Sequence, residues 1–526
     1  MKIQHFLRVH MLLAAICVLF VVAVNIAVAG YIQDDGYISF HYADNIVERG
    51  TLYYNRDAQG PYGYSNPLYI LILAALRVLS LKQISFEVLS RIIASCSLAA
   101  VLFVLLRAIP QERKAWPLPY ALALIVVVGT VFLFPYLLPN FFSGLETALF
   151  TGLLFLLLTS LCIHPLREPW FLVGLAMLLT LRVDAFVLLL PIMVAYVIQV
   201  PDPSRTIRLR NVALVAVCAA AFFLLQYFLT GTLLPLSFGH KSRSFSFIGF
   251  VGYTKLAAIV VSPLAILLLA RDRRFARLVW FAAFYLLYIS FFYGFFLIWH
   301  FERYVFPFVF AFFALLLIAL FRTWPKPDPA SLALLGVYVL FTFAPSAWLG
   351  FAWVSGYRVA MLNLQQIAVA FRQAQIDPAY RTYADYDAGY LSYQTGWTII
   401  DLGGLTTPEV THSDAAQVVA QRQPTVLIVS KGERVDPAML RLRSPFSATV
   451  GAVPANYRFV TYVPLSNAYW WPTSHYGYYI FVNEQANSAL IDGLRNISLD
   501  VEHEMGYQLF IFKCFRLLSR LQITAE

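Results

Sequence analysis

The sequence predicts an α-helical polytopic membrane protein with a C-terminal α/β domain. Hydrophobic residues make up 60% of the 526 residues and charged residues only 13%. This balance is too apolar for a soluble enzyme, and the chain is too long for one compact domain. Many apolar runs are long enough to cross the hydrocarbon core of a bilayer. After about residue 355 these runs stop and short β-like segments begin.

The apolar runs predict about eleven transmembrane helices. We expect them near residues 7–30, 86–109, 117–138, 147–163, 169–182, 184–200, 211–230, 249–270, 278–298, 304–321 and 331–352. The first run resembles a signal peptide, but it is longer than the apolar region of such peptides and lacks a convincing small-residue cleavage site. We therefore expect a retained membrane anchor at the N-terminus.

The positions of Lys and Arg predict the orientation of these helices. With the N-terminus inside, every cytoplasmic connection is basic, from Lys2 and Arg8 to Arg322 and Lys326. The net charge of +10 reflects this membrane pattern, so we expect no nucleic-acid partner. The scheme requires that the apolar stretch 67–81 does not cross the bilayer. We interpret it as a juxtamembrane or re-entrant helix.

This topology divides the chain into a membrane domain and an external domain. The membrane domain covers residues 1–354, and its first external loop, 31–85, contains juxtamembrane helices. The C-terminal domain, 355–526, then lies outside. It is predicted to be a small α/β sandwich. Its strands are expected at 398–401, 425–429, 457–463, 478–482 and 507–512, and helical patterns lie at 413–421 and 487–494.

Two adjacent acids, Asp34 and Asp35, directly follow the first span. An ionisable group at this depth is costly unless it faces water, a partner or a substrate. The alternative is a capping role, because Asp is a good N-cap for the helix that should follow. From this segment alone, both interpretations stand.

Further polar side chains are predicted to meet the same external boundary. They are Glu146, Arg182, Asp184, His240, Lys241, Arg243, His300, Glu302 and Arg303. Each has a structural alternative. Arg182 and Asp184 could be an ion pair that joins two half-helices, and Glu146 could favour the N-terminus of its helix. Lys241 and Arg243 could be interfacial cations whose stems lie along apolar surface.

Carboxylates and cations at a lipid boundary suit a lipid-anchored anionic donor and a hydroxyl acceptor. Glycosyl transfer from a polyprenyl-phosphate sugar fits this chemistry. A carboxylate would take the proton of the acceptor hydroxyl, and cations would stabilise the phosphate leaving group. A metal is the weaker option. His41, Asp44, Glu146, His240 and His300 could supply ligands, but none lies at a diagnostic spacing. We expect no required cofactor, with a divalent cation as the alternative.

Several motifs together resemble one enzyme class. They are DDGYISFHYADNIVERGTLYYN from Asp34, GYSNPLY with Tyr64 and Asn66, SGLETALF with Glu146, LRVDAFVLLLP with Arg182, GTLLPLSFGHK with Lys241, and YDAGYLSYQTGWTIIDLGGL in the external domain. These segments resemble the GT-C class of polyprenyl-phosphate-dependent glycosyltransferases. They are most similar to the branch of bacterial and mycobacterial terminal arabinofuranosyltransferases. The resemblance covers nearly the whole chain.

The resemblance implies a GT-C fold and an inverting transferase in the bacterial cytoplasmic membrane. The active site and C-terminal domain would face the periplasm or outside. It implies that Asp34 or Asp35 is the base, and that Lys241 contacts the donor phosphate. The other expected substrate-binding residues are His41, Tyr64, Asn66, Glu146, Arg182, Asp184, His240, Arg243, His300 and Arg303. His41 departs from the Arg that is usual in the pattern.

The leading hypothesis is therefore a glycosyltransferase. It would move a sugar, arabinofuranose by resemblance alone, to a hydroxyl of a cell-envelope glycan or a surface protein. We slightly prefer Asp34 as the base, since Asp35 before Gly36 is well placed to cap a helix. A transporter or flippase of lipid-linked sugars is the alternative. It would show broken helices in repeated halves, and the sequence has no such symmetry. A structural partner in an envelope complex is a third possibility.

Overall fold

The computed structural model describes most of the chain. The described residues are 2–55, 63–107, 140–163, 167–199, 204–233, 235–236, scattered positions within 250–269, 273–296, 301–323, 357, 360–411, 413–431, 435–443, 450–465 and 477–497. The predicted spans 117–138 and 331–352 and the predicted strand 507–512 lie outside these residues.

The chain divides into two compact units, which we call the helical unit and the α/β unit. The helical unit consists of Met1–Ile32, Tyr42–Leu52 and Tyr64–Gly350. The α/β unit consists of Gln33–His41, Tyr53–Gly63 and Phe351–Glu526. Two segments of the first loop, including the acidic pair, therefore belong with the C-terminal part of the chain.

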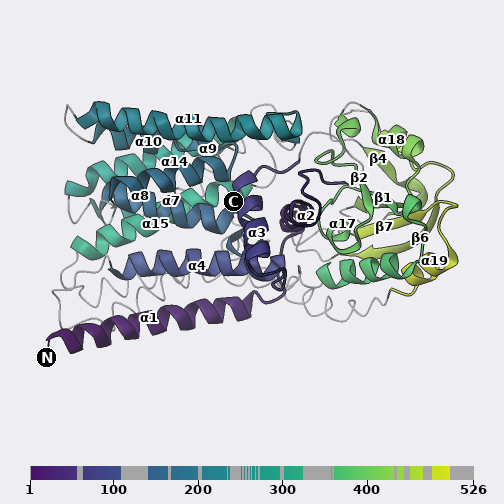
Figure 1. Cartoon of the computed structure of the whole chain (residues 1–526), viewed down its shortest axis with the longest axis horizontal. Helices are drawn as coiled ribbons and strands as arrows, with labels where there is room; N and C mark the ends of the chain where they lie inside the picture. The colour runs from purple at the N-terminus through teal and green to yellow at the C-terminus, as the bar shows by residue number, and fades with distance from the viewer. Residues whose placement is uncertain are drawn as a thin grey trace, which may run out of the picture. The chain divides into compact units, whose positions relative to one another are not determined.

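The helical unit is a layered set of long helices that run side by side (Figure 1). Its helices are α1 (Lys2–Ala27), α3 (Pro67–Leu79), α4 (Phe86–Arg107), α7 (Thr147–Cys162), α8 (Glu168–Leu181), α9 (Ala185–Leu188), α10 (Leu190–Ile198), α11 (Ser204–Thr230), α14 (Ala276–Phe296) and α15 (Phe301–Thr323). Helix α7 packs against α4, α8 and α15. It is apolar on nearly all sides, as an interior helix must be. Gly152 allows the close approach of α4, because a Cβ there would lie 3.2 Å from the Ser97 Cβ.

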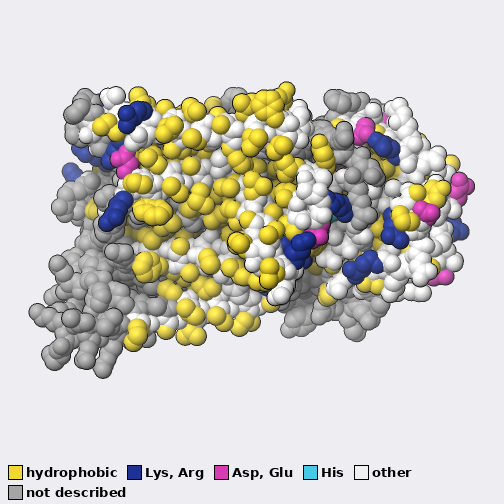
Figure 2. Space-filling model, in the orientation of Figure 1, with side chains coloured by type: hydrophobic (Ala, Val, Ile, Leu, Met, Phe, Trp, Pro, Cys, Tyr) yellow, Lys and Arg dark blue, Asp and Glu magenta, His cyan; other side chains and the backbone are white. Residues whose placement is uncertain are grey.

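Three described helical segments are long and apolar enough to cross a membrane: Phe86–Leu105, Ser204–Thr230 and Ala276–Tyr293. Six shorter apolar segments accompany them: Cys17–Ala27, Pro67–Leu79, Thr147–Cys162, Glu168–Leu181, Ala185–Ile198 and Tyr304–Leu320. Figure 2 shows hydrophobic side chains over the visible face of the helical unit. Val217 and Trp280 are among the exposed apolar residues of its helices. The chain is a multi-pass membrane protein, and the prediction of about eleven spans exceeds what the described residues show.

Two local features depart from or refine the predicted spans. The span predicted at 184–200 is interrupted at Leu189, where α9 ends and α10 begins. Pro191 stands in the first turn of α10 and has no N–H to continue the hydrogen-bond ladder of α9. Helix α3 has 13 residues, so it is about 20 Å long, shorter than a bilayer core of about 30 Å. This length agrees with a juxtamembrane position.

Helix α2 (Asp34–Arg49) follows α1 and contains residues of both units. It has Asp34 and Asp35 in its first turn and Arg49 in its last, an order that complements the helix dipole. Gly50 follows with φ of +65°, a left-handed conformation that ends helices and favours glycine. The helix that we predicted after the acidic pair is therefore confirmed.

The α/β unit contains a mixed sheet of five strands in the order β2-β1-β3-β7-β6. The strands are β1 (Thr382–Asp385), β2 (Thr398–Asp401), β3 (Val426–Lys431), β6 (Arg458–Pro464) and β7 (Gly477–Val482). Strand β1 pairs in parallel with β2 and β3, while β7 runs antiparallel to β3 and β6. A separate antiparallel pair is formed by β4 (Arg441–Arg443) and β5 (Val450–Ala452).

Three helices of this unit are α17 (Tyr390–Thr395), α18 (Ala415–Arg422) and α19 (Ser488–Arg495), and residues 360–373 are also helical. Val418, Leu427 and Tyr479 belong to the core between α18 and the sheet. The strands predicted at 398–401, 425–429, 457–463 and 478–482 and both predicted helices are confirmed. The C-terminal domain is of the predicted mixed α/β class, and β1 is an additional strand.

Candidate functional site

The acidic pair has an unexpected partner in the α/β unit, the turn that leads into α17. The Asp34 Oδ1 accepts a hydrogen bond from the Tyr390 amide at 2.7 Å, and its Oδ2 accepts one from the Gly389 amide at 3.0 Å. The Asp34 amide donates to the Tyr357 hydroxyl at 2.6 Å. Asp34 thus satisfies backbone amides at the start of α17, although Gly389 lies 355 residues later in the chain.

Burial changes the proton affinity of Asp34. The side chain is buried, and this burial raises the pKa of Asp34 to about 8, with the charge of Asp387 as the next cause. The two amide hydrogen bonds act in the opposite direction but do not cancel the effect. Asp385, at the end of β1, is fully buried, and this raises its pKa well above the usual range. At neutral pH the structure therefore favours the protonated form of Asp34.

Asp35 has a different environment from Asp34. It lies in the same first turn of α2 but is only half-buried. Its charge is one of the causes that raise the pKa of Asp34. The two acids of the pair therefore differ in exposure.

The other segment of the first loop is also bonded to the α/β unit. The Tyr54 hydroxyl donates to the Ala388 carbonyl and lies 2.5 Å from the Ser392 hydroxyl. The Asn55 amide group donates to the Ile399 carbonyl at 2.8 Å and accepts from the Ile399 amide at 3.1 Å. We call the contacts of Asp34, Tyr54 and Asn55 with residues 388–399 the loop clasp.

His41 belongs to the same part of the molecule. Its Nε2 lies 3.0 Å from the Tyr54 carbonyl oxygen, and its ring centroid is 4.5 Å from that of Tyr54. His41 is buried. It therefore supports the first loop next to the clasp, and this position does not test its predicted substrate contact.

A second polar group lies in the helical unit, at the break between α8 and α9. Arg182 is the C-cap of α8, and its guanidinium binds Asp184 with two hydrogen bonds, Nε to Oδ1 at 2.9 Å and Nη2 to Oδ2 at 2.7 Å. The Tyr293 hydroxyl donates to the Asp184 Oδ2 at 3.0 Å. The ion pair between half-helices that the sequence left open is therefore present.

Glu146 completes this group from the start of α7. Its Oε1 lies 3.8 Å from the Arg182 Nη1, and its Oε2 accepts a hydrogen bond from the Asn66 side chain at 2.8 Å. The guanidinium also lies over the rings of Tyr304 and Phe150, at 4.6 and 5.4 Å from their centroids. One cation, two acids and an amide thus share a buried place. We call Asn66, Glu146, Arg182, Asp184 and Tyr293 the buried polar group.

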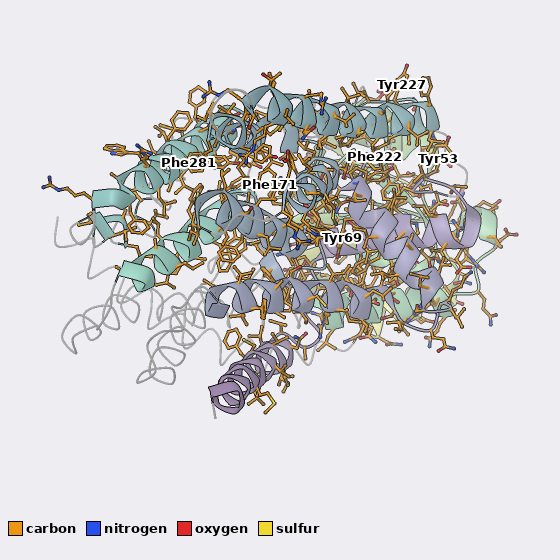
Figure 3. All side chains as sticks on the ribbon, turned by 60° about the vertical axis from the view of Figure 1, so that its left-hand side comes forward. Tyr53, Tyr69, Phe171, Phe222, Tyr227 and Phe281 are labelled. Atoms are coloured by element: carbon orange, nitrogen blue, oxygen red, sulfur yellow. The ribbon has the colours of Figure 1, made fainter. Side chains whose placement is uncertain are left out.

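Tyrosines hold the loops on which this group depends. Tyr69, labelled in Figure 3, lies on α3 and donates to the Gly144 carbonyl at 3.0 Å, so α3 fixes the turn before Glu146. Gly144 has a φ of +84°, which favours glycine there. Tyr64 contacts Tyr42 edge to face, with 4.6 Å between ring centroids.

Several predicted site residues lie outside the described part of the chain. They are His240, Lys241, Arg243 and His300. Glu302 and Arg303 lie in α15, but their side chains are not described. Within the described residues, no three His, Cys, Asp or Glu side chains are arranged to hold a metal ion. A contact of Arg182, Lys241 or Arg303 with the donor phosphate therefore stays a prediction.

The sequence reasoning missed most partners in these two groups. Gly389, Tyr390 and Asn55 were not singled out, and neither was Tyr293. The signal available for the clasp was the YDAGY stretch, which the sequence analysis noted as a motif without a contact. No local pattern relates it to Asp34.

Comparisons with known proteins agree with this architecture. Residues 357–481 match a family described as "Domain of unknown function (DUF8728)". No curated protein sequence matches the chain. The crystal structure of ArnT from Cupriavidus metallidurans bound to undecaprenyl phosphate superimposes with a TM-score of 0.52 and 13% identity, covering 80% of this chain and 92% of that one.

The structure of the same ArnT in the apo state covers 93% of this chain and 100% of that one, with a TM-score of 0.53 and 13% identity. At this identity the similarity shows a common fold. The chain is thus a helical membrane protein with a C-terminal mixed α/β domain and an ArnT-like fold.

Proposed function

We propose that the protein is a membrane glycosyltransferase of the GT-C class. It moves a sugar from a polyprenyl-phosphate donor to a hydroxyl of a cell-envelope glycan or surface protein, with inversion at the anomeric carbon. The observation that carries this proposal is the fold shared with ArnT over most of the chain, because one ArnT structure holds undecaprenyl phosphate, a lipid phosphate of the kind such a donor contains. Polar groups near the predicted external boundary supply the chemistry.

In the proposed reaction an aspartate of the acidic pair removes the proton of the acceptor hydroxyl. The acceptor oxygen forms a bond to the anomeric carbon, and the bond from that carbon to the phosphate oxygen breaks. The electron pair leaves with the polyprenyl phosphate, and the proton stays on the aspartate until it passes to solvent. Each bond that forms is balanced by one that breaks.

We propose Asp35 as the base, in place of the slight preference for Asp34 stated from the sequence. Both carboxylate oxygens of Asp34 already accept backbone amides, and the raised pKa of Asp34 favours its protonated form at neutral pH. Asp35 is half-buried and therefore more accessible to a substrate hydroxyl. Asp34 is then a positioning residue.

The buried polar group supports the orientation of donor or acceptor. Arg182 is bonded to Asp184, but its Nη1 has no hydrogen-bond partner among the described residues and is buried. This N–H is the one that could donate to a donor phosphate oxygen. Glu146 and Asn66 orient a sugar hydroxyl, and Lys241 and Arg303 add positive charge for the leaving phosphate.

The side of the membrane and the sugar are part of the proposal. The positive-inside pattern supports an active site and α/β unit that face the periplasm or outside of a bacterial cytoplasmic membrane. Arabinofuranose as the transferred sugar rests on the motif resemblance alone. The roles require no cofactor, and a divalent cation remains the alternative source of positive charge.

The test combines a deletion strain with substitutions in the acidic pair. Mass spectrometry of envelope glycans and surface proteins identifies the product that the deletion strain lacks. Membranes carrying the wild type, Asp34→Asn or Asp35→Asn are then assayed for transfer of that sugar. We expect Asp35→Asn to lower the rate by about 10²- to 10⁴-fold, the usual contribution of a general base. Undiminished transfer in both variants would remove the acidic pair from the mechanism.

A further inference from the structure

We propose that the C-terminal part of the α/β unit positions the catalytic base Asp35, with Gly389 and Asn55 as positioning residues. This inference rests on the proposed function and deepens it. The sequence predicted an external domain, and external domains invite a role in acceptor recognition. The contacts of the loop clasp give the C-terminal domain a second role, which is to position the base.

Asp34 is bonded through its side chain and its backbone to the C-terminal part of the chain. The carboxylate is buried and receives two amides from the turn at Gly389 and Tyr390, while the Asp34 amide donates to the Tyr357 hydroxyl. Both ends of this residue are therefore fixed by residues of the C-terminal part. Asp35 is the next residue in the same helical turn, so its backbone position follows from these bonds.

Gly389 lies too close to Asp34 to carry a side chain. A Cβ added there would lie 2.0 Å from the Asp34 carbonyl oxygen and 2.5 Å from its Oδ2. The φ of Gly389 is −84°, which any residue can adopt. Glycine is therefore required for the approach of Asp34, and any side chain must push α2 and the turn apart.

Tyr54 and Asn55 form a separate anchor in the second of the two first-loop segments. Asn55 donates to and accepts from the backbone of Ile399 in β2, and Tyr54 bonds Ala388 and Ser392 on either side of Gly389. The two first-loop segments thus meet the same short part of the domain. Asn55 contributes two hydrogen bonds to the clasp. Replacing Asn55 by Ala therefore weakens the clasp by removing hydrogen bonds, whereas Gly389→Ala weakens it by a steric clash.

Precise placement of a base has a large effect on rate. A displacement of about 1 Å at a catalytic group costs about a hundredfold. Loss of the clasp should therefore lower kcat more than it weakens donor binding, which depends on other residues. A general loss of domain stability would instead lower the amount of active protein.

The experiment compares Gly389→Ala with Gly451→Ala in the full chain in native membranes. Gly451 is a matched control, because its added Cβ would lie 2.2 Å from the Ala416 Cβ, in the same domain but between β5 and α18. Transfer is measured per folded molecule, and hydrogen exchange is followed over residues 33–41. Asn55→Ala is measured in parallel, in case the Gly389 variant fails to fold.

We expect Gly389→Ala and Asn55→Ala to lower kcat by about 10- to 100-fold. Their donor KM should change by less than about threefold, and exchange over 33–41 should rise. Gly451→Ala should lower the folded yield and keep the wild-type kcat and exchange over 33–41. Wild-type kcat in folded Gly389→Ala and Asn55→Ala would overturn the positioning role alone. Absence of transfer by the wild type in the same membranes would overturn the proposed function as well.

Discussion

Replacement of Arg182 by Met tests whether the buried polar group holds the break between α8 and α9. Met has a similar length and no charge, so it fills space without binding Asp184. The substitution removes two hydrogen bonds to Asp184, at 2.9 and 2.7 Å, and one to the Tyr293 hydroxyl, at 3.2 Å. It also removes the contacts with two aromatic rings. Asp184 keeps the Tyr293 hydroxyl, and Glu146 keeps the Asn66 amide.

The expected cost follows from the two acids left behind. Arg182 and Glu146 are each 3% exposed, so the charge of the arginine is compensated by protein groups rather than water. Removal of one partner of a buried ion pair costs about 3–5 kcal/mol, because the other charge stays buried and unpaired. Total stabilities are about 5–15 kcal/mol, so this loss is a large fraction. At about 2 °C per kcal/mol, a low value suited to a large unit, the melting midpoint should fall by roughly 6–10 °C.

Thermal unfolding in detergent, followed by tryptophan fluorescence, measures this change. The control is the double variant Arg182→Met/Asp184→Leu, which removes the pair together and leaves no carboxylate at position 184. We expect the double variant to recover part of the lost stability. A midpoint of Arg182→Met within about 2 °C of the wild type would refute the reasoning. So would a double variant that loses the sum of both single effects.

Two further predictions concern the α/β unit. The pKa of Asp34 is raised in the folded state to about 8, so its contribution to stability is complete at acid pH and is lost as the pH rises through about 8. Hydrogen exchange over residues 387–395 should therefore increase in the wild type, relative to Asp34→Asn, between about pH 7 and 9. A ratio of the two exchange rates that does not change with pH would contradict this. Gly63→Ala places a Cβ 2.1 Å from the Leu405 carbonyl oxygen and should cost about 1–3 kcal/mol, seen as lower monomer yield by size-exclusion chromatography. Gly493→Ala, whose added Cβ would meet its nearest neighbour at 3.2 Å, should lower the yield less.

The sequence was sufficient wherever structure depends on local patterns. Helix α2 follows from its acidic first turn and its terminal Gly50, and α3 from Pro67 at its start. The strands β3 and β7 follow from runs of apolar β-formers that are buried throughout or nearly so. These signals lie within a few residues of the element that they predict.

Strand β1 and the interruption at Leu189 show the limits of the same signals. β1 reads Thr-Tyr-Ala-Asp, four residues with no apolar run, and is a strand because β2 and β3 pair with it on both sides. The interruption within the predicted 184–200 span depends on one proline in an otherwise continuous apolar stretch. Pairing with neighbouring strands makes β1 a strand, and the missing N–H of Pro191 interrupts the helix at Leu189.

The clasp could not be predicted, for a related reason. The acidic pair was weighed as a cap for its own helix, and Asp34 lies in the first turn of α2, yet its oxygens bond the start of α17. The sequence indicates that an acid can satisfy helical amides but not which helix supplies them. The buried polar group was easier to anticipate, because Arg182 and Asp184 are two residues apart and the hairpin brings them together.

The two polar groups balance their charges in different ways, and the difference bears on the acidic pair. In the helical unit Arg182 lies between Asp184 and Glu146, so a cation compensates buried acids. In the α/β unit Asp34 is held by amides and lies near the charges of Asp387 and Asp35, and these, with burial, raise its pKa to about 8. A neutral Asp34 places no second negative charge beside Asp35, so one acid of the pair can stay ionised while the other holds a proton. Neighbouring carboxyl groups in unlike environments commonly take separate acid and base roles, and here the burial that keeps Asp34 neutral supports the proposed role of Asp35 as the proton acceptor.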